Sequence, residues 1–487
     1  MSGQLSKRTE NQNVPQWRYW QSVRPNQVAL FTANKNYTWA QLAEKVAVAS
    51  QNLESEGVTR NTCVTVIGKN SLESVILYLA CQEIGAVCAF VMPAPLNIIE
   101  NKLDTLYGEQ LTRYVYLGHE SGLNDNEISS INARVISPLM QIDSEEVSTY
   151  FDSETYSTVT AYQDSQLASI IFSSGSTGIP KAVAHTVSQH RSSAEGLLKD
   201  FHYRALDCWL LSLPIYHVSG LAIVHRWLEA GAALKVGVGN LAADFNGVTH
   251  ASLVPTQLKR LLDSQCDLSL THVLLGGSQI PMQLAQQAKD QGIDTWLGYG
   301  MTEAASTVTA KPVDGLEGCG HVLSNRKVKI TKQRIFISGE TLAQGYYHQG
   351  ICTPMVDDEG WFDSKDLGCW QDGQLVVIGR ADNQFISGGE NIHCEEIERV
   401  LNQHPDVVQS IVIPIADEEF GHRPVAVIET KNEVKTRPNK QDIERFLDGK
   451  LEKFKWPVRY ELMPDESRQG GIKVSRQFLA DYLNRVR

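Results

Sequence analysis

The sequence predicts an α/β protein in which parallel-type sheets with covering helices precede a small α+β domain. Strand-like and helix-like segments alternate over the first two-thirds of the 487 residues, a pattern typical of parallel sheets. After about Gly373 the pattern changes to short strands, a glycine turn and a helix. A chain of this length exceeds what one hydrophobic core supports, so two or three domains are expected.

In the first part, buried-looking strands are expected at 63–70, 87–92, 167–174, 233–239, 250–255 and 271–277. Helical spacing of apolar residues predicts helices at 71–86, 256–264 and 281–292. The last part predicts strands at 410–417 and 424–430 and a helix at 441–454. We place the boundary in the segment GRAD, which gives domains 1–380 and 381–487.

Composition limits the possible partners. A net charge of −12 argues against a nucleic-acid partner, which usually requires a basic face. The nine cysteines are scattered and form no C-x-x-C pair, which is typical of reduced thiols in a cytoplasmic protein. The apolar run 74–92 is interrupted by Gln82 and Glu83, so we expect core structure rather than membrane insertion. The sequence leaves open whether the protein forms a homo-oligomer.

A loop rich in hydroxyls and glycine follows the expected strand at 167–174. The stretch SSGSTGIPK, residues 173–181, offers backbone N–H groups, hydroxyls and a lysine, which together favour a phosphate ligand. It is not a Walker A loop, because Pro180 and Ala182 stand where that motif requires glycine and a hydroxyl residue. A mobile loop without a ligand is the alternative.

Three further segments carry candidate site residues. In GYGMTEAAS, Thr302 supplies a hydroxyl and Glu303 a hard oxygen ligand for Mg²⁺, although an ordinary capped turn explains them equally well. Asp366 in GWFDSKDLG could accept ribose hydroxyls or simply be an Asx-turn residue. Near the end, Lys473 lies in a glycine-flanked loop, where a solvated surface lysine is the alternative.

The order of these motifs is more specific than any one of them. SSGSTGIPK, PIYHVSG, GYGMTE, GETLAQGYY, GWFDSKDLG, GRAD, FISGGENI and KVSR together resemble the adenylate-forming superfamily of acyl-CoA synthetases, luciferases and peptide-synthetase adenylation domains. The resemblance covers the chain from about Thr38 to its C-terminus. It implies a large N-terminal domain that includes a distorted β-barrel, and a small mobile C-terminal domain. It also implies ATP, Mg²⁺ and coenzyme A as co-substrates or cofactors.

The resemblance assigns roles to positions of this sequence. Catalytic roles fall on Lys473, Thr302, Glu303 and His217, with Glu303 also the metal ligand. The nucleotide-binding positions are Ser173, Ser174, Gly175, Ser176, Thr177, Gly178, Lys181, Gly276, Gly277, Ser278, Tyr299, Gly300, Thr302, Asp366 and Arg380. Ser387, Gly388 and Gly389 would approach the pantetheine arm of coenzyme A, and Asp382 would be the hinge.

This sequence departs from the family pattern at three places. The usual P-K-G is Pro180-Lys181-Ala182, and the usual T-G-D is Ser364-Lys365-Asp366. Near the end, S-G-K becomes Gly471-Ile472-Lys473, although Lys473 and Arg476 keep the K-x-x-R spacing. The third change weakens the lysine assignment without offering another candidate.

The compact stretch between GYGMTE and GETLAQGYY and the ending RQGGIKVSRQFLADYL most resemble the branch of the superfamily that acts on o-succinylbenzoate, for menaquinone biosynthesis. That substrate is an aromatic keto-diacid, of which one carboxylate reacts and the other must be held. His217 resembles the residue that flanks the acyl pocket, and Arg226, nine residues later, could pair with the spare carboxylate. An arginine that reaches the surface or pairs with Glu229 is the alternative.

Two other functions stay open from the sequence. The chain could activate a fatty or simple aryl acid instead, which a substrate panel would distinguish. It could also bind a nucleotide or acyl-adenylate without catalysis, although retention of Glu303, Asp366, Arg380 and Lys473 together argues against this. Motifs alone do not exclude luciferase-type oxygenation or carrier-protein loading.

Overall fold

The structure is a computed structural model, which describes residues 14–109, 111–118, 120–137, 162–173, 181–264, 266, 268–276, 282–387, 390–431, 439–468 and 474–485. Its chain divides into two compact units. The larger unit takes its described residues from 14–327 and 337–362, and the smaller unit from 328–336 and 363–485. The predicted division at residue 380 stays a prediction.

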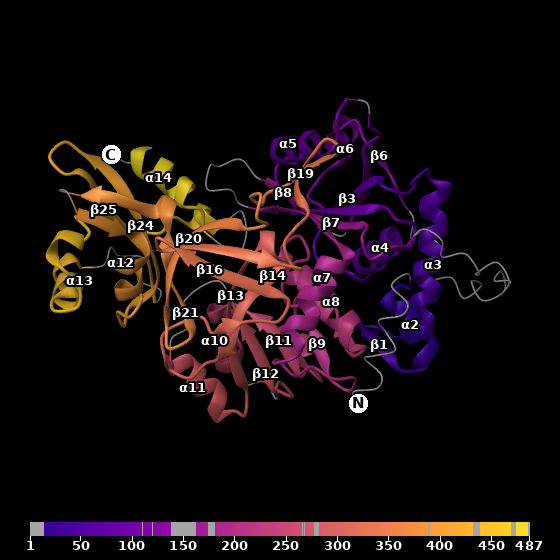
Figure 1. The fold of residues 1–487 in the computed structure, drawn as a ribbon, viewed down its shortest axis with the longest axis horizontal. Coiled ribbons are helices and arrows are strands. Elements are labelled where there is room, and N and C mark those ends of the chain that lie inside the picture. Colours follow the sequence, from indigo (N-terminus) through magenta and orange to yellow (C-terminus); the bar gives the residue numbers. More distant parts are fainter. Residues whose placement is uncertain are drawn as a thin grey trace. The chain divides into compact units, whose positions relative to one another are not determined.

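Two mostly parallel sheets form the larger unit (Figure 1). The first has the order β15 (His321–Val322), β14 (Ser306–Pro312), β13 (Asp294–Met301), β12 (His272–Leu275), β11 (His250–Leu253), β9 (Cys208–Leu210), β10 (Ala233–Lys235), β1 (Val28–Phe31) and β2 (Asn36–Thr38). The second has the order β19 (Ile351–Thr353), β18 (Gly345–His348), β8 (Lys181–Thr186), β7 (Leu167–Ser173), β4 (Val87–Val91), β3 (Cys63–Ile67), β5 (Tyr114–Leu117) and β6 (Arg134–Val135). In both, the central strands are parallel; antiparallel strands lie at both edges of the first sheet and at the β19 edge of the second, whereas β6 pairs in parallel with β5.

The helices of the larger unit are α2 (Gln16–Val23), α3 (Trp39–Ser55), α4 (Leu72–Glu83), α5 (Leu96–Leu106), α6 (Asp125–Ser130), α7 (Val187–Leu198), α8 (Val218–Ala230), α9 (Leu241–Phe245), α10 (Pro255–Asp263) and α11 (Met282–Asp290). Helix α4 begins where the Ser71 hydroxyl accepts a hydrogen bond from the Ser74 amide. It is buried from Ser74 to Glu83. Glu83 accepts hydrogen bonds from the Trp17 indole at 3.0 Å and from Arg18, which compensates its burial.

Two further sheets lie mostly in the smaller unit. The first has the order β16 (Arg326–Thr331), β17 (Arg334–Gly339), β20 (Phe362–Gln371) and β21 (Gln374–Arg380). The second joins β23 (Glu390–His393), β22 (Gln384–Ser387), β25 (Gly421–Thr430) and β24 (Val407–Asp417), with β26 (Arg459–Leu462) paired to β25. Its helices are α12 (Cys394–Leu401), α13 (Lys440–Leu447) and α14 (Arg476–Arg485).

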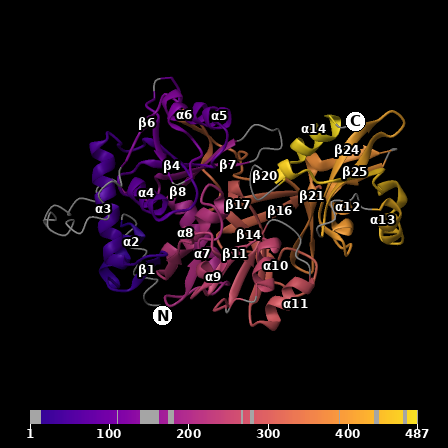
Figure 2. The same ribbon diagram turned by 180° about the vertical axis from the view of Figure 1, so that it is seen from behind.

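Alternation of side chains along β24 and β25 gives this second sheet two apolar faces. Val412 and Ala426 pack in the same cluster as residues of α12 and α13, whereas Ile411 and Val425 pack with residues of α14. Figure 2 shows α12 and α13 on one side of the two strands and α14 on the other. The apolar runs at 410–417 and 424–430 are therefore covered on both faces.

The α/β class, the alternation in the first part and the expected strands and helices are confirmed, but two predicted ends are wrong by four residues or more. The predicted strand at 233–239 ends at Lys235. The predicted helix at 441–454 ends at Leu447, because Asp448 is extended and Gly449 has a φ of +75°. Helical spacing of apolar residues continues past a point at which the backbone already turns.

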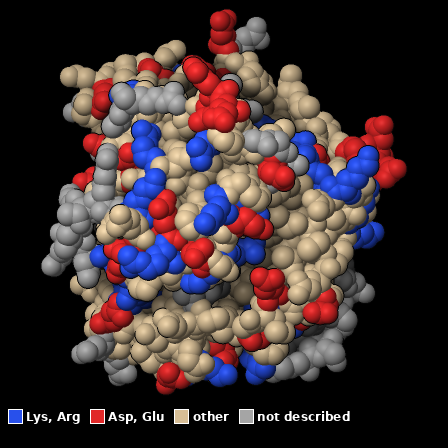
Figure 3. Space-filling model, turned by 90° about the vertical axis from the view of Figure 1, so that its left-hand side faces the viewer, with Lys and Arg blue, Asp and Glu red and all other residues tan. Residues whose placement is uncertain are grey.

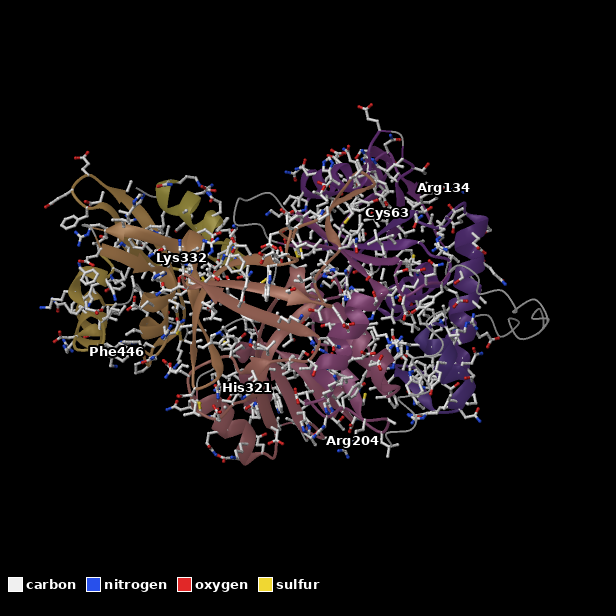
Figure 4. All side chains as sticks on the ribbon, in the orientation of Figure 1. Cys63, Arg134, Arg204, His321, Lys332 and Phe446 are labelled. Atoms are coloured by element: carbon white, nitrogen blue, oxygen red, sulfur yellow. The ribbon has the colours of Figure 1, made fainter. Side chains whose placement is uncertain are left out.

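Five of the cysteines are buried in the structure. All nine cysteines are free, and burial raises the pKa of Cys63, at the start of β3 (Figure 4), to about 12. None of the described helices combines the length and apolar character that a membrane crossing requires. On the face drawn in Figure 3, basic side chains are interspersed with acidic ones.

Candidate active site

Strands β7 and β8 hold both ends of the predicted phosphate loop. Ser173, the last residue of β7, and Lys181, the first of β8, are partners in the antiparallel ladder. The loop between them therefore leaves and re-enters the sheet at adjacent positions. The candidates Ser174, Gly175, Ser176, Thr177 and Gly178 lie outside the described residues.

Lys181 and Glu303 approach a common residue, Tyr346 of β18. The Lys181 Nζ atom lies 4.8 Å from the centre of the Tyr346 ring, within cation–π range. The Tyr346 hydroxyl lies 3.4 Å from Glu303 Oε1, a long hydrogen bond. The structure thus brings together two residues that the sequence assigned to phosphate and metal, and adds a third that sequence reasoning missed.

Thr302 and Glu303 lie on a single 3₁₀ turn, η3 (Thr302–Ala304), between β13 and β14. The backbone after this turn is strained, since Ala305 and Ser306 have φ angles of +49° and +93°. Gly300 makes the turn possible, because a Cβ atom there would lie 1.8 Å from the Ser306 carbonyl oxygen.

A hydrogen-bond network fixes the strained segment. The Ser193 hydroxyl of α7 donates to the Ala305 carbonyl at 2.6 Å. Arg326 is buried and donates in turn to the Ser193 hydroxyl at 2.8 Å and to the Ser193 carbonyl at 2.9 Å. Strain that surrounding bonds hold in place is common at active sites, so this network supports a functional turn at Thr302 and Glu303.

The predicted adenine platform comes from the ends of two neighbouring strands. Gly276 directly follows β12, and Tyr299 and Gly300 lie near the end of β13, which pairs with β12 in parallel. No described atom lies within 4 Å of the place where a Cβ atom at Gly276 would stand, so a flat group can approach this backbone. Gly277 and Ser278 lie outside the described residues.

Helix α8 carries both candidates for the acyl pocket. His217 is the N-cap of α8, half-buried, with its ring 4.9 Å from that of Tyr216. Arg226 lies two turns further on and is only 2% exposed. Its guanidinium donates to the Thr307 hydroxyl at 3.1 Å, approaches the Ser252 hydroxyl at 3.5 Å and stacks over the Trp209 ring at 5.3 Å.

Among the described residues, Arg226 contacts no carboxylate. The alternative pairing with Glu229 is wrong, because Glu229 instead accepts from Gln16 at 2.5 Å and lies 3.6 Å from Arg191. Burial, together with the charge of Arg326, lowers the pKa of Arg226 to about 9, which leaves it cationic at neutral pH. A buried cation that contacts only hydroxyls and an aromatic ring is an arrangement suited to an anionic ligand.

In the smaller unit, Asp366 and Arg380 are partners in the β20–β21 ladder. Arg380 Nη1 lies 3.4 Å from Asp366 Oδ1, and the same guanidinium makes two 3.2 Å contacts with Asp382 in η4 (Ala381–Asn383). Asp366 is buried and Arg380 is 40% exposed, so a ligand can reach the guanidinium of this pair from solvent.

Lys365 explains one departure from the family pattern. It has a left-handed φ of +65° at the place where the family has glycine. Its amide and ammonium both donate to the Asp363 carboxylate, at 3.1 Å and 2.6 Å, which supports this conformation locally. The turn before Asp366 is therefore kept without the glycine.

The remaining candidates of the smaller unit border segments outside the described residues. Ser387 is buried at the end of β22, whereas Gly388, Gly389 and Lys473 are not described. Three residues after Lys473, Arg476 begins α14 and anchors it to α12. Arg476 donates twice to Glu398, at 2.6 Å and 2.8 Å, and once to the Val412 carbonyl at 2.8 Å.

The oxygen ligands suit Mg²⁺ better than a transition metal. No group of three or more His, Cys, Asp or Glu side chains that could hold a metal occurs in the described part of the chain. Mg²⁺ commonly uses one or two carboxylates together with phosphate oxygens and water. The single carboxylate of Glu303 fits that pattern.

Sequence reasoning missed the residues that support the site. Tyr346 had a signal, since it lies in the GETLAQGYY motif, to which no role was given. Thr307, Ser252, Ser193 and Arg326 had none, because they come from separate strands and a helix that only the fold brings together.

Comparison with known proteins agrees with this geometry. A sequence profile described as AMP-binding enzyme matches residues 17–347, and one described as AMP-binding enzyme C-terminal domain matches residues 396–470. The chain belongs to the AMP-binding enzyme family. This family comprises the adenylate-forming enzymes that the motif order resembled.

Similar AMP-binding enzymes include two curated relatives over nearly their whole length. The 2-succinylbenzoate–CoA ligase of Salmonella typhimurium is 38% identical over 468 residues, which cover 96% of this chain and 97% of the relative. The 2-succinylbenzoate–CoA ligase of Escherichia coli is 38% identical over 471 residues, which cover 96% of this chain and 98% of the relative.

Solved structures of AMP-binding enzymes are similar as well. An arginine-to-lysine variant of E. coli MenE with bound OSB-AMS is 36% identical, with a TM-score of 0.84, 98% of this chain and 99% of that chain covered. The o-succinylbenzoate coenzyme A synthetase (MenE) of Bacillus subtilis, in complex with ATP and magnesium ion, is 22% identical, with a TM-score of 0.78, 92% of this chain and 96% of that chain covered. The second likeness concerns the fold alone.

Proposed function

We propose that this chain is an AMP-forming acid–thiol ligase that joins o-succinylbenzoate to coenzyme A, a step of menaquinone biosynthesis. Relatives of this activity are 38% identical over 96% of the chain. The observation that carries the choice of acid is the buried guanidinium of Arg226, which contacts no carboxylate among the described residues. A diacid supplies one carboxylate for reaction and a second for this cation.

The reaction has two steps. In the first, an oxygen of the substrate carboxylate attacks the α-phosphorus of ATP, and the bond from that phosphorus to the bridging oxygen breaks, which releases pyrophosphate. In the second, the sulfur of coenzyme A, having lost its proton, attacks the acyl carbon, and the acyl–oxygen bond to AMP breaks. Negative charge accumulates on phosphate oxygens in the first step, so positioned cations and hydroxyl donors accelerate it.

ATP and the acid are bound by separate sets of residues. Lys181 and the hydroxyls of the 173–178 loop hold the triphosphate, and the Thr302 hydroxyl donates to the α-phosphate. Gly276, Tyr299 and Gly300 form the surface for adenine, and Asp366 and Arg380 bind the ribose. Mg²⁺, held by Glu303, supplies positive charge to the phosphate oxygens.

The acid lies against α8. His217 flanks the reacting carboxylate, and Arg226 holds the spare one, with Thr307 and Ser252 fixing the guanidinium. Lys473 bridges the developing charge during adenylation, Asp382 acts as the hinge, and Ser387, Gly388 and Gly389 approach the pantetheine arm. We place the enzyme in the cytoplasm, where its nine free cysteines stay reduced.

Pyrophosphate release with MgATP tests the proposal. We expect release that is selective for o-succinylbenzoate over benzoate and a medium-chain fatty acid, and a thioester that forms only when coenzyme A is present. Release with another acid would keep the adenylation chemistry and reject the substrate. No release with any of the three acids would favour a protein that binds acyl-adenylates without catalysis.

A further inference from the structure

The GETLAQGYY segment contacts the candidate phosphate and metal residues at several points. The Ala343 amide donates to the Glu303 carbonyl at 2.8 Å, and the Gln344 amide donates to the Ala184 carbonyl of β8 at 2.9 Å. Tyr346 then contacts both Glu303 and Lys181. The segment therefore joins η3 to the strand that begins at the end of the phosphate loop.

We propose that Tyr346 is a positioning residue, which fixes the Glu303 carboxylate for Mg²⁺ and the Lys181 ammonium for the triphosphate. This inference rests on the proposed function, because it assumes a magnesium–nucleotide ligand. It assigns one residue of the GETLAQGYY segment to the organisation of the site. Tyr346 itself touches no reacting atom in this account.

Strand geometry explains why Tyr346 reaches Lys181. Tyr346 of β18 is the ladder partner of Val183 in β8. Lys181 lies two residues before Val183, and side chains two apart on a strand point to the same face. Lys181 is thus the diagonal neighbour of Tyr346, within reach of a long side chain.

The neighbouring residue Tyr347 points to the opposite face. It is buried in a cluster that includes Ala182 and Ala184, and it takes part in the core of the second sheet. The two adjacent tyrosines therefore have different roles, one in packing and one at the site. This difference supplies a matched control.

The hydroxyl and the ring of Tyr346 act on different partners. The Tyr346 hydroxyl donates to Glu303 Oε1 at 3.4 Å. A carboxylate held at one oxygen presents the other in a fixed direction, which favours metal binding. The ring face holds the Lys181 ammonium by the cation–π contact, which needs no hydroxyl.

Two substitutions separate these effects. Tyr346→Phe removes the hydroxyl and keeps the ring, whereas Tyr346→Leu removes both. Binding is measured with Mn²⁺ by electron paramagnetic resonance, in the presence of α,β-methylene-ATP, and the affinity for the nucleotide analogue alone is measured by calorimetry. Tyr347→Phe is the matched control.

We expect Tyr346→Phe to weaken Mn²⁺ binding about 10-fold, the usual effect of losing a residue that orients a metal ligand, with nucleotide affinity changed less than about twofold. Tyr346→Leu should weaken both. Equal Mn²⁺ affinity in Tyr346→Phe and Tyr347→Phe would overturn the inference.

A double-mutant cycle with Glu303→Gln tests the contact from its other end. The Tyr346→Phe effect on Mn²⁺ should disappear in that background, and an undiminished effect would contradict the proposed contact. Should Tyr346→Phe fail to fold, Tyr346→Leu is compared with Tyr347→Phe instead, and equal Mn²⁺ affinity in those two variants would overturn the inference. These binding measurements need no turnover. They therefore test the role of Tyr346 even if the wild-type enzyme releases no pyrophosphate with o-succinylbenzoate, a result that would reject only the proposed function.

Discussion

Two arginines, Arg226 in the larger unit and Arg476 in the smaller, differ in the groups that surround their charge. Arg476 faces two carboxylates, with Glu398 at 2.6 Å and 2.8 Å and Glu395 at 3.3 Å. Arg226 is more deeply buried, yet its contacts among the described residues are two hydroxyls and an indole ring.

The pKa values of the two arginines differ in the way that these contacts predict. Burial alone would lower the pKa of both guanidinium groups. The charges of Glu398 and Glu395 outweigh burial at Arg476 and raise its pKa, whereas burial and Arg326 lower the pKa of Arg226 to about 9. A buried charge with its partner inside the protein supports the fold, and one without such a partner is available to a ligand.

The largest expected effect is on stability, at Arg476. Arg476→Met leaves Glu398, whose side chain is only 13% exposed, without its guanidinium partner, which should destabilise the smaller unit by about 3–5 kcal/mol. Hydrogen exchange of the α12 and α14 amides, followed by mass spectrometry, measures this loss within the unit.

Arg226→Met is the matched control for that measurement. It removes an uncompensated cation, so the stability of the larger unit should stay within about 1 kcal/mol or increase. Equal destabilisation by both substitutions would mean that the two arginines do not differ as proposed.

The second effect is on activity, at Arg226. Arg226→Met should lower kcat/KM for o-succinylbenzoate about 100-fold, or about 3 kcal/mol, because the spare carboxylate loses its cation. The KM for ATP should change little, since the triphosphate is assigned to the loop between β7 and β8 and Arg226 to the spare carboxylate of the acid. Steady-state kinetics with each substrate varied in turn measures both values.

A simple aryl acid such as benzoate provides the control substrate. It has no second carboxylate, so any slow turnover of benzoate should be unaffected by Arg226→Met. Parallel losses for o-succinylbenzoate, benzoate and ATP would remove Arg226 from the acyl pocket.

The smallest expected effect is on the pH dependence of stability, at three buried, neutral histidines. His185, His190 and His225 stack with ring centres 4.7 Å and 4.3 Å apart. Burial lowers the pKa of all three histidines, to about 4 for His185 and about 3 for His225, and neighbouring rings lower it further at His190 and His225. Below about pH 6.5 the histidines of the unfolded chain take up protons, whereas those of the folded chain do not. The stability therefore decreases as the pH decreases, by up to about 1.4 kcal/mol per pH unit for each histidine.

His190→Gln should therefore reduce the stability lost between pH 7 and pH 5.5 by about 1 kcal/mol. Urea unfolding at the two pH values measures it. An identical pH dependence in wild type and His190→Gln would show that the stack does not exclude protons.

Much of the fold followed from local patterns. Apolar runs of strand length predicted β3, β4, β7 and β11, and the helical spacing at 71–86 predicted α4. The end of the helix predicted at 441–454 was wrong, because Gly449 stops it while apolar spacing continues. Motif order assigned functional roles to Thr302 and Glu303, and the structure adds the 3₁₀ turn on which they lie and the positive φ angles of Ala305 and Ser306 after it.

The sequence by itself determined the α/β class, the family and the identity of the residues that motifs carry, because each of these depends on neighbours close along the chain. Only the tertiary structure decided that Arg226 faces Thr307 and Ser252 instead of Glu229, and that Tyr346 joins Lys181 to Glu303. These contacts join residues that lie from 26 to 165 positions apart, as their numbers show. Strand pairing and burial bring such residues together, and neither is written in the local pattern of a single segment.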